Sequence, residues 1–104
     1  MSKIVVITGC SAGLGIAIAV QAAQKGHKVY ATMRDTKKRA ALDAAVATTK
    51  VDVVVLALDV ANTQSVNTCL ESIFAKEGRI DVLINNAGSG FVRSTEQASE
   101  EDIA

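Results

Sequence analysis

Residues Lys3–Gly15, KIVVITGCSAGLG, carry the strongest indication of how this chain folds. The first six of these residues are mostly β-branched, which is typical of a short strand, and a glycine ends the run. A helical pattern then begins at Gly13, because Leu14, Ile18 and Ala22 recur four residues apart. A strand that turns through glycines directly into a helix is the first unit of an alternating α/β chain.

The remaining sequence repeats this alternation. Apolar runs predict further strands, and segments with helical spacing predict helices between them. The expected strands are Lys3–Thr8, Lys28–Met33, Val51–Leu58 and Ile80–Ile84, and the expected helices are Gly13–Lys25, Thr36–Thr48 and Thr63–Glu77, with another helix starting at Ser99–Asp102. Thr36 and Thr63 are the expected N-caps, and Gly26 is the expected left-handed C-cap.

Helical crossovers of this length connect parallel strands, and such connections are almost always right-handed. The run Val51–Leu58 is nearly continuous in apolar residues, which predicts a strand buried on both faces. We therefore expect an α/β fold: a doubly wound parallel sheet of four strands in the order 3-2-1-4, with helices on both faces.

Composition restricts the class of protein. A chain of 104 residues with 49% hydrophobic residues is one globular domain at most. Residues 1–50 carry eight basic and two acidic side chains and residues 51–104 carry three and nine, so the halves are +6 and −6. The net charge of zero argues against non-specific nucleic-acid binding. With no long apolar run and no secretory signal, we expect a soluble cytoplasmic protein, no membrane partner, and Cys10 and Cys69 as free thiols.

Ligands of such sheets bind beyond the carboxyl ends of the strands, near the point where the strand order reverses. The first loop there, Gly9–Gly15, has the spacing G-x-x-x-G-x-G. Its backbone can approach a pyrophosphate, toward which the following helix directs free N–H groups. It is not a Walker P-loop, since no Gly-Lys-Ser/Thr follows. An ordinary tight turn is the alternative.

The second loop begins with Arg34, directly after the strand Lys28–Met33. An arginine there can pair with a ribose 2′-phosphate and favours NADP, whereas an acid would favour NAD. Asp35 keeps NAD open as the alternative cofactor. The basic residues that follow, Lys37, Lys38 and Arg39, are interpreted as a solvated helix start.

The third and fourth loops carry polar residues. Asp59, before Val60, can accept a hydrogen bond from an adenine amino group or can equally cap the turn before the next helix. In the fourth loop, Asn85–Gly88 (NNAG), amides can satisfy neighbouring strand ends, and the small Ala-Gly pair leaves room for a flat ligand.

Together, Thr8-Gly9-x-x-x-Gly13-x-Gly15, Asp59-Val60 and Asn85–Gly88 resemble the short-chain dehydrogenase/reductase family, across essentially the whole chain. The stretch Val29–Asp35 is similar to its NADP-preferring branch of hydroxysteroid and retinol dehydrogenases. The resemblance implies a three-layer Rossmann-type fold. It also implies a cofactor site with the following parts: Gly9, Ser11, Ala12, Gly13, Leu14 and Gly15 at the pyrophosphate and ribose, Arg34 at the 2′-phosphate, Asp59 and Val60 at the adenine, and Asn86, Ala87 and Gly88 along the two riboses. Thr8 and Asn85 would hold the sheet ends together, and Cys10 would be a small loop residue, not a nucleophile.

The catalytic part of the family pattern is absent. The family uses Tyr-x-x-x-Lys on a helix, with a nearby Ser and an Asn. The only tyrosine here, Tyr30, precedes Arg34 by four residues and falls on a predicted strand, so we reject it as the catalytic acid. His27 is expected to face solvent, and no metal-ligand spacing is present. We therefore expect residues 1–104 to be the truncated amino-terminal, NAD(P)-binding half of an NADP-dependent oxidoreductase, inactive alone, with an unknown alcohol or carbonyl substrate.

Two other classes compete with this interpretation. The chain is alternatively a non-catalytic nucleotide-binding or self-associating module, because the strand Ile80–Ile84 would form an open edge that favours homo-oligomers. A Rossmann-like methyltransferase is disfavoured, since it accounts neither for the glycine spacing nor for Asn85–Gly88.

Overall fold

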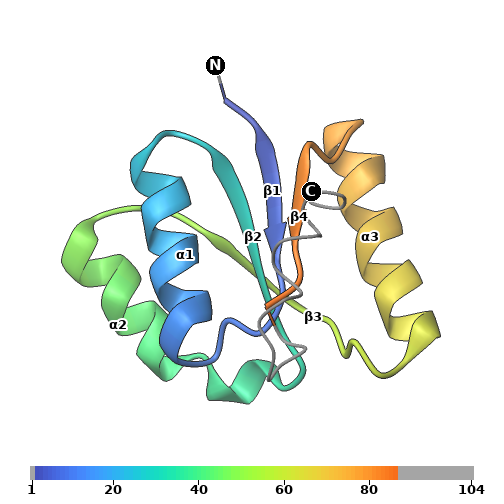
Figure 1. Cartoon of the computed structure of the whole chain (residues 1–104), viewed down its shortest axis with the longest axis horizontal. Coiled ribbons are helices and arrows are strands. Elements are labelled where there is room, and N and C mark those ends of the chain that lie inside the picture. Colours follow the sequence, from blue (N-terminus) through green and yellow to red (C-terminus); the bar gives the residue numbers. More distant parts are fainter. Residues whose placement is uncertain (1, 87–104) are drawn as a thin grey trace.

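A computed structural model describes residues 2–86, and in it the four strands form one parallel sheet (Figure 1). The strands are β1 (Ile4–Ile7), β2 (Lys28–Met33), β3 (Val54–Ala57) and β4 (Val82–Ile84). Their order is β3-β2-β1-β4, which confirms the predicted order. Val6 lies opposite Tyr30 of β2 and Leu83 of β4, so the register of the central strand is fixed from both sides.

Helices cover both faces of this sheet and make three layers. They are α1 (Gly13–Gln24), α2 (Ala40–Thr49) and α3 (Thr63–Glu77), with a short 3₁₀ helix, η1 (Thr36–Lys38), before α2. Figure 1 shows α1 and α2 on one face and α3 on the other. Alternate residues of β1 divide between the two cores: Val5 and Ile7 pack on the α1 side, and Ile4 and Val6 pack on the α3 side.

Three strands are shorter than predicted. β1 and β4 each lack two residues of the predicted Lys3–Thr8 and Ile80–Ile84. β3 has four residues instead of the eight predicted for Val51–Leu58, and its side chains are half-buried or, at Ala57, exposed. The exposure of β3 follows from its position, since β3 lies at the edge of the sheet and, among the described strands, pairs only with β2. An apolar run predicts a strand, but full burial requires a neighbour on each side.

Both predicted N-caps were wrong. The helix predicted over Thr36–Thr48 is η1 followed by α2, and α2 begins at Ala40 after Arg39, whose side chain makes no capping hydrogen bond. Asn62, not Thr63, caps α3, and its Oδ1 accepts the Ser65 N–H at 3.0 Å. Asp35, not Thr36, caps η1, and its Oδ1 accepts the Lys37 N–H at 3.0 Å. In both places the capping residue has an extended backbone, and its side chain reaches the amides of the first turn.

The end of α1 agrees with the prediction, and the residue after its terminal glycine differs from it. Gly26 follows α1 with φ +90°, which confirms its left-handed role. His27 is half-buried instead of fully exposed, and its Nδ1 accepts the Lys3 N–H at 3.1 Å. The expected helix start Ser99–Asp102 lies outside the described residues. The longest helix, α3, has 15 residues, and among residues 2–86 no helix has the length and apolarity to cross a membrane.

Candidate functional site

A cleft of about 450 Å³ lies at the carboxyl ends of the strands, where four loops meet. Its lining comes from the loops after all four strands: Gly9, Ser11, Met33, Arg34, Leu58, Asp59, Val60, Ala61 and Asn86. Six of these residues belong to the set predicted from the sequence. Three lining residues were not predicted: Met33, Leu58 and Ala61. Each is next to a predicted residue in the sequence, and this adjacency is the signal that could have identified them.

The glycine-rich turn is shaped by one very close contact. A Cβ on Gly15 would lie 2.1 Å from the carbonyl oxygen of Gly9 and 2.9 Å from Asn86 Nδ2. Only a glycine therefore allows α1 to start so close to the end of β1. Asn86 Nδ2 donates to the same Gly9 oxygen at 3.0 Å, so the fourth loop holds the first in place.

The start of α1 leaves its backbone amides available. Ala12 precedes the helix with φ −162° and ψ 166°, and no side chain caps the first turn. Gly13 has φ +55°, a left-handed conformation that side chains other than glycine adopt at a cost. Uncapped N–H groups and the positive end of the helix dipole favour an anion at this point. Leu14, on the first turn, has 63% of its surface exposed, so residues 2–86 leave most of this side chain open.

One basic side chain of the cleft is free to bind an anion. Arg34 lines the cleft, is exposed, and makes no ion pair with any residue of the described chain. Arg39, by contrast, pairs with Asp43 through Nε at 3.0 Å. Asp35 Oδ1 accepts the Lys37 N–H, which is a local cap. The ribose contact by which Asp35 keeps NAD open stays a prediction alongside it.

Asp59 has a defined local role in this structure. Its Oδ1 accepts the Ala61 N–H at 3.0 Å, and its carbonyl oxygen accepts the Asn62 N–H at 2.9 Å. The turn-capping alternative is therefore confirmed. Among residues 2–86 the second carboxylate oxygen, Oδ2, has no hydrogen-bond partner, so adenine binding stays a prediction alongside it.

A structural role was expected for Thr8, Asn85 and Cys10, and their contacts and burial agree with it. Thr8 Oγ1 donates to Asn85 Oδ1 at 3.1 Å, and the Thr8 N–H donates to the Ile84 carbonyl at 3.0 Å, which joins the ends of β1 and β4. Cys10 is fully buried, and burial raises the pKa of its thiol to about 12. A thiol that stays protonated at neutral pH is not a nucleophile.

Tyr30 is also removed from the cleft. Its ring is buried under α3, and its hydroxyl donates to the Glu77 carboxylate at the end of that helix. Burial, and then the hydrogen bond to Glu77, raise the pKa of Tyr30 to about 12. A phenol held in this way is not an acid–base group for a ligand in the cleft.

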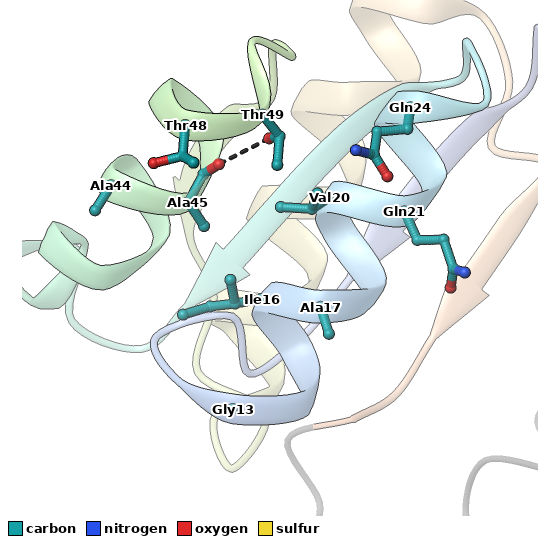
Figure 2. A pocket seen from close by; sticks show the side chains of 10 residues that line it. All are labelled: Gly13, Ile16, Ala17, Val20, Gln21, Gln24, Ala44, Ala45, Thr48 and Thr49. Atoms are coloured by element: carbon teal, nitrogen blue, oxygen red, sulfur yellow. Dashed lines mark hydrogen bonds between the residues drawn. The ribbon is translucent and has the colours of Figure 1, made fainter.

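A larger hollow of about 720 Å³ lies on the outer surface between α1 and α2 (Figure 2). Its lining consists of small, aliphatic and amide residues, with no titratable side chain. The one hydrogen bond drawn there joins Thr49 Oγ1 to the Ala45 carbonyl at 2.7 Å and closes within α2 itself. Residues 2–86 contain no cluster of side chains able to hold a metal ion. The cleft at the strand ends is thus the candidate site.

The comparisons with known proteins agree with this geometry. The family model for short chain dehydrogenase matches residues 3–104. Human retinol dehydrogenase 8 is 43% identical over 101 residues, which cover 93% of this chain and 32% of that protein. Human 17-beta-hydroxysteroid dehydrogenase type 1 is 39% identical over 107 residues, 97% of this chain and 32% of the relative.

Solved structures give the same result. A metagenomic short-chain oxidoreductase in complex with NADP superposes with a TM-score of 0.76 at 28% identity, covering 97% of this chain and 47% of that one. The chain spans about a third of the length of the curated relatives it matches, 34% and 32% for the first two. The strand order, the glycine-rich turn and these matches agree, and the chain belongs to the short-chain dehydrogenase/reductase family.

Proposed function

We propose that this chain binds NADP(H) and is the cofactor-binding part of an oxidoreductase that acts on an alcohol or a carbonyl compound. The observation that carries the choice of cofactor is Arg34, an exposed guanidinium in the cleft that no carboxylate of residues 2–86 neutralises. Guanidinium groups pair with phosphate through two parallel hydrogen bonds. NAD has no 2′-phosphate and would leave this group unused.

The residues present fit a dinucleotide. The close approach of Gly15 to Gly9 leaves a narrow backbone turn beside the uncapped start of α1, where a pyrophosphate would be held. In this proposal the pyrophosphate and its ribose contact the first loop, at Gly9, Ser11, Ala12, Gly13, Leu14 and Gly15. Arg34 contacts the 2′-phosphate, and the adenine lies against Asp59 and Val60. The riboses contact Asn86, Ala87 and Gly88. Ala87 and Gly88 lie outside the described residues.

The bound cofactor would supply a hydride at its nicotinamide ring. This chain's own residues bind and orient the dinucleotide, and for the 104 residues alone we propose binding without turnover. Tyr30, the single tyrosine of the sequence, is buried against Glu77 and cannot serve as the proton donor. The proposal names no substrate beyond the class of alcohol or carbonyl.

The test is a fluorescence titration of NADPH and NADH against the wild-type chain and Arg34→Ala. A charge-assisted pair contributes about 1.5–3 kcal/mol, and for an exposed arginine we expect the lower end, about a tenfold preference for NADPH. Arg34→Ala removes that preference and leaves NADH binding unchanged. Arg39→Ala, which loses an exposed arginine already paired with Asp43, is the matched control. No NADPH preference in the wild type, or an equal loss in Arg39→Ala, contradicts the assignment.

We also propose that the isolated chain self-associates through the open edge of its sheet. Among the described strands β4 pairs only with β1, which leaves backbone groups unpaired on its other side, and Leu83 of β4 is 38% exposed. Light scattering at high concentration would show oligomers, and Leu83→Lys would reduce them. A monodisperse wild-type monomer contradicts this proposal.

A further inference from the structure

We infer that Ser65, on the first turn of α3, positions Asp59 for recognition of the adenine ring. Ser65 does not line the cleft, so its effect is indirect. The inference rests on the proposed function, because it concerns the adenine end of the same dinucleotide.

The hydroxyl of Ser65 is the contact that carries this inference. Ser65 Oγ accepts the backbone N–H of Asp59 at 2.9 Å, across six residues of chain. Ser65 is itself anchored, since its own N–H donates to Asn62 Oδ1 at 3.0 Å. The Asn62 N–H in turn donates to the Asp59 carbonyl. Both backbone polar groups of Asp59 are therefore tied to the start of α3.

The chain is held differently on the two sides of Asp59. Leu58, directly before Asp59, is buried and its N–H donates to the Met33 carbonyl at 2.9 Å, so the incoming chain is fixed to β2. Val60 is 42% exposed and Ala61 is exposed, so packing does not hold the outgoing chain. The Ser65 hydroxyl is thus the tertiary contact that fixes the Asp59 backbone at the cleft.

This restraint has a chemical consequence. With Oδ1 held by the Ala61 amide, Asp59 presents Oδ2 as an acceptor. An adenine amino group donates to such an oxygen, whereas hypoxanthine carries a carbonyl there, which a carboxylate repels. A fixed Asp59 therefore selects adenine over hypoxanthine, and a loosened one selects less well.

The experiment compares the binding of NADPH with that of its hypoxanthine analogue by the 104-residue chain. One net hydrogen bond corresponds to a preference of up to about tenfold for NADPH in the wild type. Ser65→Ala is expected to reduce the preference to within about twofold, and Ser65→Thr, which keeps the hydroxyl, to restore it. Ser65 also borders an open groove with Thr68 and Ser72, which leaves room for the added methyl group.

Two further variants complete the design. Asp59→Asn should lose the preference by itself, and adding Ser65→Ala to it should cause no further loss, because both changes act through the same carboxylate. Ser72→Ala is the matched control. It removes a hydroxyl from the same helix that, among the described residues, bonds only to the Cys69 carbonyl, and it should keep the wild-type preference.

The outcomes separate the two proposals. If Ser65→Ala weakens both nucleotides equally, or weakens neither, Ser65 has no positioning role, and this inference alone is overturned. If the wild-type chain binds neither nucleotide, the proposed function is overturned and the role of Ser65 with it.

Discussion

Replacing Gly15 with alanine perturbs the closest contact in the cleft. The added Cβ would meet the Gly9 carbonyl oxygen at 2.1 Å and Asn86 Nδ2 at 2.9 Å, distances at which these groups have to move. The nearer atom belongs to the backbone, so side-chain rotation cannot relieve the overlap. Moving the Gly9 carbonyl also separates it from the Asn86 amide, which donates to it at 3.0 Å.

The magnitude follows from these two effects. Overpacking a close contact costs about 1–3 kcal/mol, and losing a hydrogen bond costs about 0.5–1.5 kcal/mol. We therefore expect the free energy of unfolding to fall by about 2–4 kcal/mol. Urea unfolding followed by the helical circular dichroism would show a lower midpoint at an unchanged slope. NADPH affinity should fall as well, because the displaced Gly9 lines the cleft.

The matched control is Gly13→Ala, the same change in the same turn. Gly13 has φ +55°, but a Cβ added there would meet no atom within 4 Å, so the expected cost is only the left-handed strain of about 1–2 kcal/mol. Gly15→Ala should also cost less in an Asn86→Ala background, where one clashing group is already gone. If Gly15→Ala is no less stable than Gly13→Ala, the close-approach argument is refuted.

Three further predictions concern titratable groups outside the cleft. The Ile4 N–H donates to Asp81 Oδ2 at 2.7 Å, and this bond lowers the pKa of the Asp81 carboxyl. The ionised carboxylate therefore contributes its full stabilisation above pH 3.8, the ordinary pKa, and loses it as the pH falls further. Urea midpoints should fall in acid less steeply in Asp81→Asn than in the wild type. Burial raises the pKa of Tyr30 to about 12, so the free energy of unfolding should decline as the pH rises above 10.0, the ordinary pKa. Phenolate absorbance should appear near pH 10 in urea but only near pH 12 in the native chain. Equal titration midpoints in the two states would contradict this. Burial raises the thiol pKa values of Cys10 and Cys69, so iodoacetamide should label both only after unfolding, as mass spectrometry would show; rapid native labelling would disprove their burial.

Much of the fold could be predicted from local patterns. The bounds of α3 and β2 agree with the structure to the residue, because apolar periodicity and β-branched runs are properties of short windows. The strand order followed from the alternation of strands and helices, which is typical of a doubly wound mononucleotide-binding sheet. The burial of β3 was predicted wrongly from the apolar run Val51–Leu58 alone, although the predicted strand order already places this strand at the edge of the sheet. The cap of α3 was wrong by one residue, because the run Asn62-Thr63 contains two competent capping side chains. The start of α2 was missed because the separate 3₁₀ helix η1 precedes it.

The sequence predicts which loops form the site, but not which residues of those loops contact one another. The sequence placed Gly9, Arg34 and Asp59 at the strand ends, and the cleft brings them together. It did not reveal that Asn86 holds the Gly9 carbonyl, or that Ser65 holds the Asp59 amide. Both are contacts between side chains and backbone that depend on distances set by the assembled sheet, for which no local signal exists.

The most direct test of cofactor binding in the cleft is an NMR titration of the ¹⁵N-labelled chain with NADPH. Cofactor binding in the cleft should change chemical shifts first at the amides of Gly9, Ser11, Arg34 and Asp59 and at the Asn86 side chain, which line the cleft. The groove between α1 and α2, sampled at Val20 and Ala45, should stay unchanged. Changes confined to that groove, with the cleft amides unperturbed, would contradict cofactor binding in the cleft.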